Sequence, residues 1–232
     1  MRSERDEVDR LDPMAALAAF GRAAYSDLVS IVVLSVLASL ASLPLVTVGA
    51  AVLALVDTVT EIVAGELAGE GVSERRRARR FATEFRANLR RGLPISALVL
   101  AVVGSTVAYL LIATAAGSTV FLLGAAVGLY AVFCAVALSL RTASLLARMP
   151  EERSQSVLAT VRDAAYHLLE TPSFTVLTVV LMAVLVALCA ALRVAVVVLL
   201  PGLLGLLEVV AFEETSGVGA RRVVRAYRGE LR

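Results

Sequence analysis

Long apolar segments alternate along the chain with shorter polar segments that hold nearly all of its charged residues. The apolar segments approach the roughly 20 residues that a helix needs to cross about 30 Å of hydrocarbon. The pattern predicts an all-α integral membrane protein, with a single membrane domain over residues 1–232. The six predicted transmembrane helices lie near residues 28–43, 45–64, 93–113, 119–140, 173–192 and 194–212.

Short, uncharged connections pair these helices into three hairpins. The first pair is joined at Ser42-Leu43-Pro44, and the second at residues 114–118. The third pair comes from one apolar run, 172–212, which as a single helix would be about 60 Å long and must fold back. A turn near Ala191–Arg193 gives two spans of similar length, with Pro201 kinking the sixth helix. A turn at Pro201-Gly202 has better turn chemistry but leaves one helix short, so length favours the first position.

The polar segments between the hairpins predict amphipathic helices. In one of them Phe81, Phe85 and Leu89 repeat at helical spacing, and arginines occupy the opposite face. Helices of this kind lie in the membrane interface with the apolar face turned to the lipid. The predicted helices cover about residues 13–26, 75–91, 151–170 and 220–231.

Charge predicts the orientation of the chain. All 22 basic residues are arginine, and the run 75–80 holds five of them. Cytoplasmic loops of membrane proteins carry an excess of arginine. We therefore expect a multi-pass protein of the plasma membrane, with both termini and the long polar segments in the cytoplasm. The net charge of +2 is too small to indicate a nucleic-acid partner.

A short motif marks the first hairpin. Pro44, Thr47 and Gly49 form the pattern P-x-x-T-x-G-A, and residues 81–88 form an aromatic amphipathic segment before the third span. In both features the chain resembles the YesL-like family of small polytopic membrane proteins, over about residues 14–215. The resemblance implies an accessory membrane role, since members are often associated with carbohydrate uptake systems. The molecular function of that family is not established, and it supplies no catalytic residue.

Packing explains this motif on physical grounds alone. Pro44 ends the first helix without needing a backbone partner. Thr47 can donate to a carbonyl in the turn, and Gly49 lets another helix approach closely. The pair Gly124 and Gly128 is a similar close-packing signal, which favours packing within the chain over a dimer face.

Three acids interrupt the apolar segments. Asp57 and Glu61 lie four residues apart on one helix face, and Glu208 reaches a similar depth if the last turn is near Arg193. Acids inside a membrane are costly and are usually tied to function, so they form a candidate polar intramembrane site. A second interpretation places them at the inner interface, paired with the arginine-rich helix. Arg193 either extends to the headgroups or, with a turn at Pro201, forms an ion pair with Glu208.

The arginine-rich helix is the predicted surface for a partner or for lipid. Its candidate residues are Arg75, Arg76, Arg79, Arg80, Phe81, Phe85 and Asn88. Setting the membrane topology would explain the same arginines without either role.

The sequence favours a protein that is not an enzyme. It contains one histidine, two cysteines inside apolar segments and no catalytic motif, so we expect no cofactor and no metal. The leading hypothesis is an accessory or scaffold subunit of a transport system, with membrane lipids and a permease or other membrane protein as partners. The alternative is a small-solute or ion transporter that uses Asp57, Glu61 and Glu208. The oligomeric state stays open.

Overall fold

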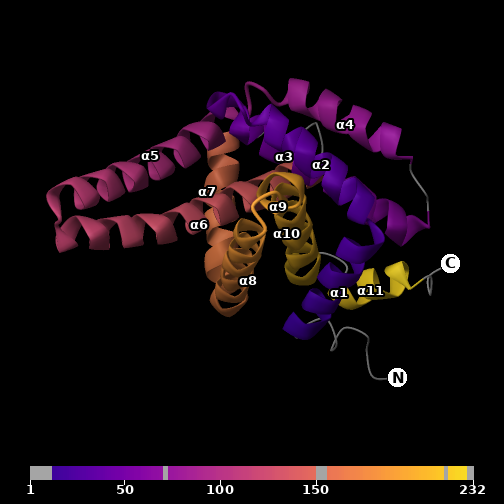
Figure 1. Cartoon of the computed structure of the whole chain (residues 1–232). Helices are drawn as coiled ribbons and strands as arrows, with labels where there is room; N and C mark the ends of the chain where they lie inside the picture. The colour runs from indigo at the N-terminus through magenta and orange to yellow at the C-terminus, as the bar shows by residue number, and fades with distance from the viewer. Residues whose placement is uncertain (1–11, 70–72, 150–155, 217–218, 229–232) are drawn as a thin grey trace.

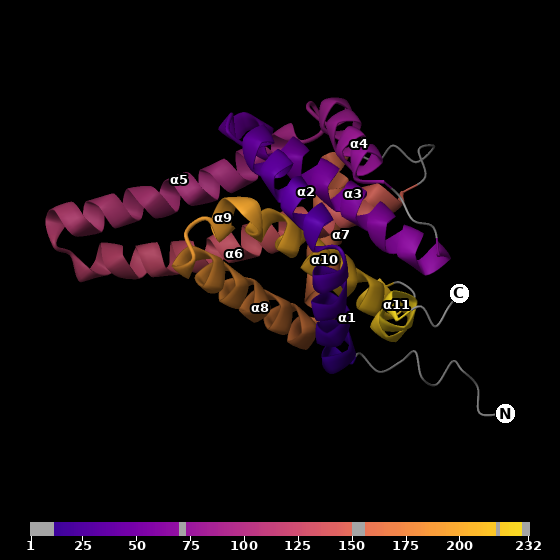
Figure 2. The same cartoon turned by 45° about the vertical axis from the view of Figure 1, so that its right-hand side comes forward.

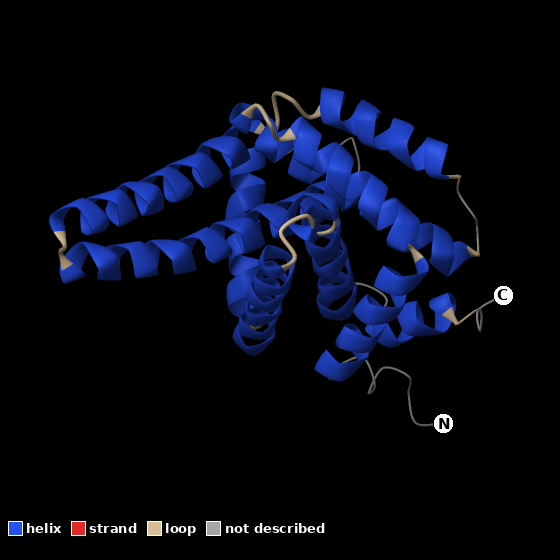
Figure 3. Cartoon of the chain, viewed as in Figure 1, coloured by secondary structure: helices blue, strands red, loops and turns tan. Residues whose placement is uncertain are grey.

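Every regular element in the described part of the chain is helical (Figure 3). The computed structural model describes residues 12–69, 73–149, 156–216 and 219–228. The predicted all-helical fold class is therefore confirmed. The helices, labelled in Figure 1, are α1 Pro13–Ser26, α2 Leu28–Ala41, the 3-10 helix η2 Leu45–Thr47, α3 Val48–Ala68, α4 Glu74–Ala87, α5 Leu93–Ala116, α6 Thr119–Arg148, α7 Val157–Glu170, α8 Pro172–Ala191, α9 Ala195–Val198, α10 Leu200–Ser216 and α11 Ala220–Tyr227.

Four of these helices are long and apolar enough to cross a membrane: α3 with the preceding η2, α5, α6 and α8. A fifth candidate is the pair α1 and α2, which are bent by 85° at Asp27. The chain is therefore a membrane-embedded helical protein with four or five candidate spans among the described residues. Helix α10 has 17 residues and falls just short of the length of the others.

Helices α1 to α4, α10 and α11 form the part of the molecule that we call the body, with α3 at its centre (Figure 1). Small residues such as Ala50 and Ala54 on α3 are fully buried and let neighbouring helices come close. The core also includes Leu34 of α2, Val209 of α10 and Val223 of α11. As a result, 61% of the residues in the most apolar 18-residue stretch of α3 and the preceding η2 are buried by the rest of the protein.

Helix α5 and the part of α6 that pairs with it extend from the body as a feature that we call the arm (Figures 1 and 2). Its helices pack directly on each other, since a Cβ at Gly124 would meet the Tyr109 ring at 2.7 Å and one at Gly128 would meet Thr106 at 2.6 Å. The two glycines thus serve packing within the chain. Outside the contact between its two helices, the arm is not covered by protein. Only 11% of the most apolar 18-residue stretch of α5 and 17% of that of α6 are buried.

The sequence predicts that the short connections of the first two hairpins lie on one side of the membrane and the long polar segments on the other. The structure does not have this arrangement. Gly49, just after the Pro44 connection, donates its N–H to Ser96 Oγ at 2.8 Å, near the start of α5. A Cβ at Gly49 would lie 2.1 Å from the carbonyl oxygen of Gly92. A parallel arrangement would place these residues on opposite sides of about 30 Å of hydrocarbon. The arm instead begins beside the tip of the first hairpin and extends beyond it (Figure 2).

The amphipathic helix α4 also departs from the prediction. It ends at Ala87, and its apolar face packs on α3 rather than on lipid. Phe81 is buried and stacks on Phe85 with 6.3 Å between ring centroids. Helix α11 likewise buries Val223. Residues 151–155 and 229–231 of the other predicted amphipathic helices lie outside the described residues.

The last apolar run turns near Ala191–Arg193, the position that segment length favours. Helix α8 ends at Ala191, and Arg193 adopts a left-handed φ of 49°. The predicted helix 194–212 is not continuous, because α9 and α10 are separate, and Pro201 lies in the first turn of α10 instead of kinking it. The break is held by Ser35 Oγ of α2, which donates to Leu199 O at 3.1 Å and accepts from Gly202 N–H at 2.8 Å.

Candidate functional site

The acids predicted as one polar site belong to two separate ion-pair clusters. In the first, Arg80 Nε of α4 lies 2.9 Å from Asp57 Oδ2 and 2.9 Å from Glu61 Oε2 on α3. The three side chains are partly exposed, at 39%, 18% and 26% respectively. Partly exposed pairs of this kind contribute only about 0–1 kcal/mol to stability. The contacts hold α4 against α3, and the two carboxylates share one arginine, so the charge of only one of them is balanced within this cluster.

The second cluster is buried between α6 and α10. Arg141 Nε lies 2.9 Å from Glu208 Oε1, and only 6% and 2% of the two side chains are exposed. These two atoms make no hydrogen bond within the described residues, so charge attraction holds them. Arg141 Nη1 donates to Thr215 Oγ1 at 3.2 Å, and its guanidinium lies 5.2 Å from the Phe212 ring centroid.

The alternative pair of Arg193 with Glu208 is therefore wrong. Glu208 is paired with Arg141, while Arg193 lies exposed in the turn after α8. One turn further along α10, Arg148 Nη2 bonds Glu213 Oε1 at 2.7 Å and stacks on the Phe212 ring at 4.1 Å. Two arginines in the C-terminal half of α6 therefore bind this helix to α10.

A third polar cluster, which the sequence did not reveal, lies at the bend between α1 and α2. Arg77 Nη1 bonds Asp27 Oδ1 at 3.3 Å and Glu74 Oε1 at 3.0 Å, and it also donates to Ser30 Oγ. Tyr227 Oη of α11 donates to Asp27 Oδ2 at 2.8 Å. Burial, together with the Asp27 charge, raises the pKa of Tyr227 above its usual range. The cluster joins the bend to α4 and α11.

The ends of the described chain are also tied together. Asp12 caps α1 by accepting from Ala15 N–H at 3.0 Å, and it accepts from Arg221 Nη2 at 2.9 Å. These two interactions lower the pKa of Asp12, the Ala15 hydrogen bond most. Glu214 of α10 accepts from Asp12 N–H at 2.6 Å and from Ala220 N–H at 2.7 Å. The helices α1, α10 and α11 are therefore joined by polar contacts at one end of the body.

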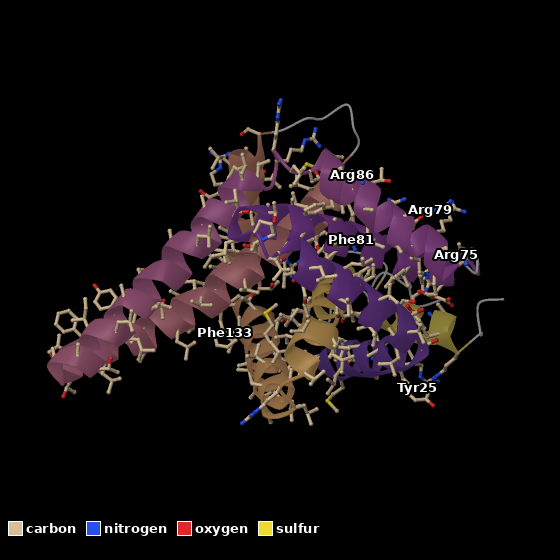
Figure 4. The ribbon with its side chains drawn as sticks, turned by 45° about the horizontal axis from the view of Figure 1, so that its top comes forward. Tyr25, Arg75, Arg79, Phe81, Arg86 and Phe133 are labelled. Atoms are coloured by element: carbon tan, nitrogen blue, oxygen red, sulfur yellow. The ribbon has the colours of Figure 1, made fainter. Side chains whose placement is uncertain are left out.

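The predicted partner-facing or lipid-facing helix has two distinct sides. Phe81 is buried, and Arg80, Phe85 and Asn88 are only partly exposed, so these residues belong to the packed side. The sequence predicts that the apolar residues of this helix face lipid, whereas in the structure they pack on α3. Exposed positions include Arg75, Arg76 and Arg79. Figure 4 shows Arg75 and Arg79 along the outer edge of α4, with Phe81 on the inner side.

The first-hairpin motif has a packing role in the structure. Thr47 Oγ1 donates to Ala41 O at 2.5 Å and to Pro44 O at 2.6 Å, which closes the connection between α2 and α3. Gly49 permits the close contact with the start of α5. These residues position the base of the arm.

Cavities lie between the described helices, and two of them are lined by none of the ion-paired residues. One, of about 190 Å³, lies between α1, α8 and α10, and the other, of about 240 Å³, lies between α2, α3, α5, α6 and α10. Apart from Thr178 in the first and three serines in the second, their linings are apolar. Within the part of the chain that the structure describes, no three metal-binding side chains come together. The polar clusters therefore join helices, and they line neither of these two cavities.

Comparisons with family models, curated proteins and solved structures found no match to this chain. The resemblance to the YesL-like family stays a prediction that rests on Pro44, Thr47, Gly49 and the segment 81–88.

Proposed function

We propose that this chain is a non-enzymatic accessory or scaffold subunit of a transport system in the plasma membrane. Both termini lie in the cytoplasm in this proposal, in keeping with the arginine-rich segments. The resemblance to the YesL-like family makes a carbohydrate uptake system the first to test. A permease or other membrane protein would be the partner, and the arm would provide the contact.

One observation carries the proposal: the exposed face of α5 is built from small residues. They are Ala97, Ala101, Gly104, Ser105 and Ala108, all on the bare side of the arm. Gly104 has no atom within 4 Å of the position of a Cβ. Small residues at spacings of three and four let a second membrane helix approach closely, whereas lipid chains gain nothing from them. The face therefore fits a transmembrane helix of a partner.

Helix α4 is less suited to this contact than the sequence predicts. Its apolar residues Phe81 and Phe85 are already packed within the body. A partner would meet only its arginine side, which has no apolar anchor of the kind that central interface residues provide. The docking role accordingly moves from α4 to the arm.

The transporter alternative receives less support from the contacts. Asp57 and Glu61 are both held by Arg80, and Glu208 is paired with Arg141, so each of the three acids already has an arginine contact. A cation or proton site needs a carboxylate that faces a polar path, and none of the three acids lines either of the two cavities described above, which are mostly apolar. The ion pairs instead match a role in holding helices together.

Site-specific photo-crosslinking in native membranes tests the proposal. The crosslinker replaces Leu111, an exposed residue two turns beyond Gly104 on the same face of α5, or Val127, an exposed apolar residue of α6 that serves as control. We expect crosslinks from position 111 to one membrane protein, identified as a permease by mass spectrometry, and lipid adducts alone from position 127. Gly104→Leu should abolish co-purification of that protein, while Val127→Leu should preserve it. The absence of any protein crosslink from position 111 would overturn the proposal.

A further inference from the structure

The arginines of α4 and of the connection to α5 fall into two groups. Arg77 and Arg80 point into the body and are neutralised by Asp27, Asp57 and Glu61, among others. The second group lies on the outer side, and we call it the arginine stripe. It consists of Arg75, Arg76, Arg79, Arg86, Arg90 and Arg91, all exposed.

The arginine stripe carries positive charge that the described residues do not balance. None of its members forms an ion pair with an acid within the parts of the chain that the structure describes. The two acids of α4 have other contacts, since Glu74 pairs with Arg77 and Glu84 accepts from the Asn88 side chain at 3.4 Å. Figure 4 shows Arg75, Arg79 and Arg86 in a row along the outer edge of the helix. The spacing of this row keeps the guanidinium groups on one face.

The arginine stripe begins next to the base of the arm, where the chain is expected to enter the membrane. Arg90 and Arg91 immediately precede the arm, whose first exposed apolar residue is Leu93. From Leu93 to Leu140 the chain has no charged residue, and most of the apolar surface of the arm is uncovered. Hydrocarbon is the medium that covers such a surface, so the base of the arm lies at the level of the lipid headgroups. The stripe begins at that level and continues along α4.

We propose that the arginine stripe binds the phosphate groups of anionic phospholipids in the leaflet next to the body. A guanidinium group matches a phosphate through two parallel hydrogen bonds and stays charged at any physiological pH. An unpaired row of such groups next to an apolar segment is complementary to a negatively charged headgroup layer. This binding is independent of the partner proposed for the arm. It needs the arm to lie in the membrane, and α4 together with the α3 helix on which it packs to lie at the membrane surface.

The test uses the full-length protein in nanodiscs that contain phosphatidylcholine and phosphatidylglycerol. The measurement is the enrichment of phosphatidylglycerol among lipids retained on the protein, quantified by native mass spectrometry. The test variant is Arg75→Gln/Arg79→Gln/Arg86→Gln. The control variant is Arg22→Gln/Arg222→Gln/Arg225→Gln, which removes the same charge from exposed positions on α1 and α11.

One arginine near an anionic surface contributes about fivefold to affinity. The triple stripe variant should therefore lose on the order of a hundredfold in apparent affinity for phosphatidylglycerol, and the control should lose less than about threefold. Replacement of the same three arginines by lysine should restore only part of the binding, because lysine keeps the charge but lacks the paired hydrogen bonds of a guanidinium group. Higher salt should weaken the binding of the wild type. Circular dichroism verifies that each variant is folded.

Equal enrichment of phosphatidylglycerol in the wild type and the stripe variant would overturn the proposal. Equal losses in the stripe and control variants would also overturn it, since the effect would then follow net charge alone. An acidic protein that co-purifies through the stripe, with lipid enrichment unchanged, would assign the surface to a protein partner instead. None of these results depends on whether position 111 crosslinks to a permease, so the two proposals fail separately.

Discussion

The buried pair of Arg141 and Glu208 gives the strongest prediction about stability. Replacement of Glu208 by Gln leaves the Arg141 charge between α6 and α10, where only 6% of its side chain is exposed. Loss of one partner from a buried ion pair costs about 3–5 kcal/mol. For a chain of 232 residues this corresponds to a fall in Tm of roughly 6–20 °C. Arg141→Gln should cost a similar amount plus its contact with the Phe212 ring, about 0.5–2 kcal/mol.

The double variant Arg141→Met/Glu208→Leu separates the cost of an unpaired charge from the value of the pair. Replacement of both charges by apolar groups is often neutral or stabilising, so the double variant should be more stable than either single one. Thermal unfolding in detergent can be followed with a thiol-reactive dye that reports exposure of the buried Cys189, in a Cys134→Ala background. Arg193→Gln is the control, and we expect a change within about 0.5 kcal/mol. A Glu208→Gln protein as stable as this control would refute the reasoning.

Three further predictions concern contacts that join helices. Gly49→Ala should cost at least about 1–3 kcal/mol because its methyl group would overlap the backbone of α5; Gly21→Ala, which has open space around it, should gain up to about 1 kcal/mol in the same assay. The raised pKa of Tyr227 means that the folded state holds the phenol proton more tightly than the unfolded state, so stability should fall as pH rises above about 10. Tyr227→Phe should remove this loss of stability at alkaline pH. At neutral pH it should lower the free energy of unfolding by about 1.5–3 kcal/mol, because Asp27 loses a hydrogen bond. Denaturation at several pH values measures both effects. The lowered pKa of Asp12 predicts stability that is lost as pH falls through about 3.8 and below, and Asp12→Ala should flatten that acid limb of the pH profile without affecting the alkaline one.

Segment length and periodicity predict much of this fold. The apolar runs identify the long helices, and the turn near Ala191–Arg193 follows from the length of a membrane span. The hairpin register does not follow, because it depends on the contact between Gly49 and Gly92, which are 43 residues apart in the chain. An apolar helix that packs on protein has the same composition as one that faces lipid. For this reason the sequence could not show that α3 is covered and α5 is bare.

The ion-pair partners were difficult to predict for a related reason. The chain has 22 arginines and 20 acids, so pattern alone leaves many pairings possible. Arg141 follows the apolar part of α6 and reads as the start of a cytoplasmic segment. The helix continues to Arg148, however, and carries Arg141 into the packed interior beside Glu208. The apolar run and the helix therefore end at different residues, and the sequence pattern shows only where the apolar run ends.

The uncharged arm also has a consequence for biogenesis. Between Leu93 and Leu140 no charged side chain has to be carried across the bilayer, and the two helices already pair through Gly124 and Gly128. Translocation of one charge against a potential of 100 mV involves about 2.3 kcal/mol, and this term is zero for the arm. The two helices can therefore enter the membrane without this electrical cost. Their insertion should proceed equally well in energised and de-energised vesicles.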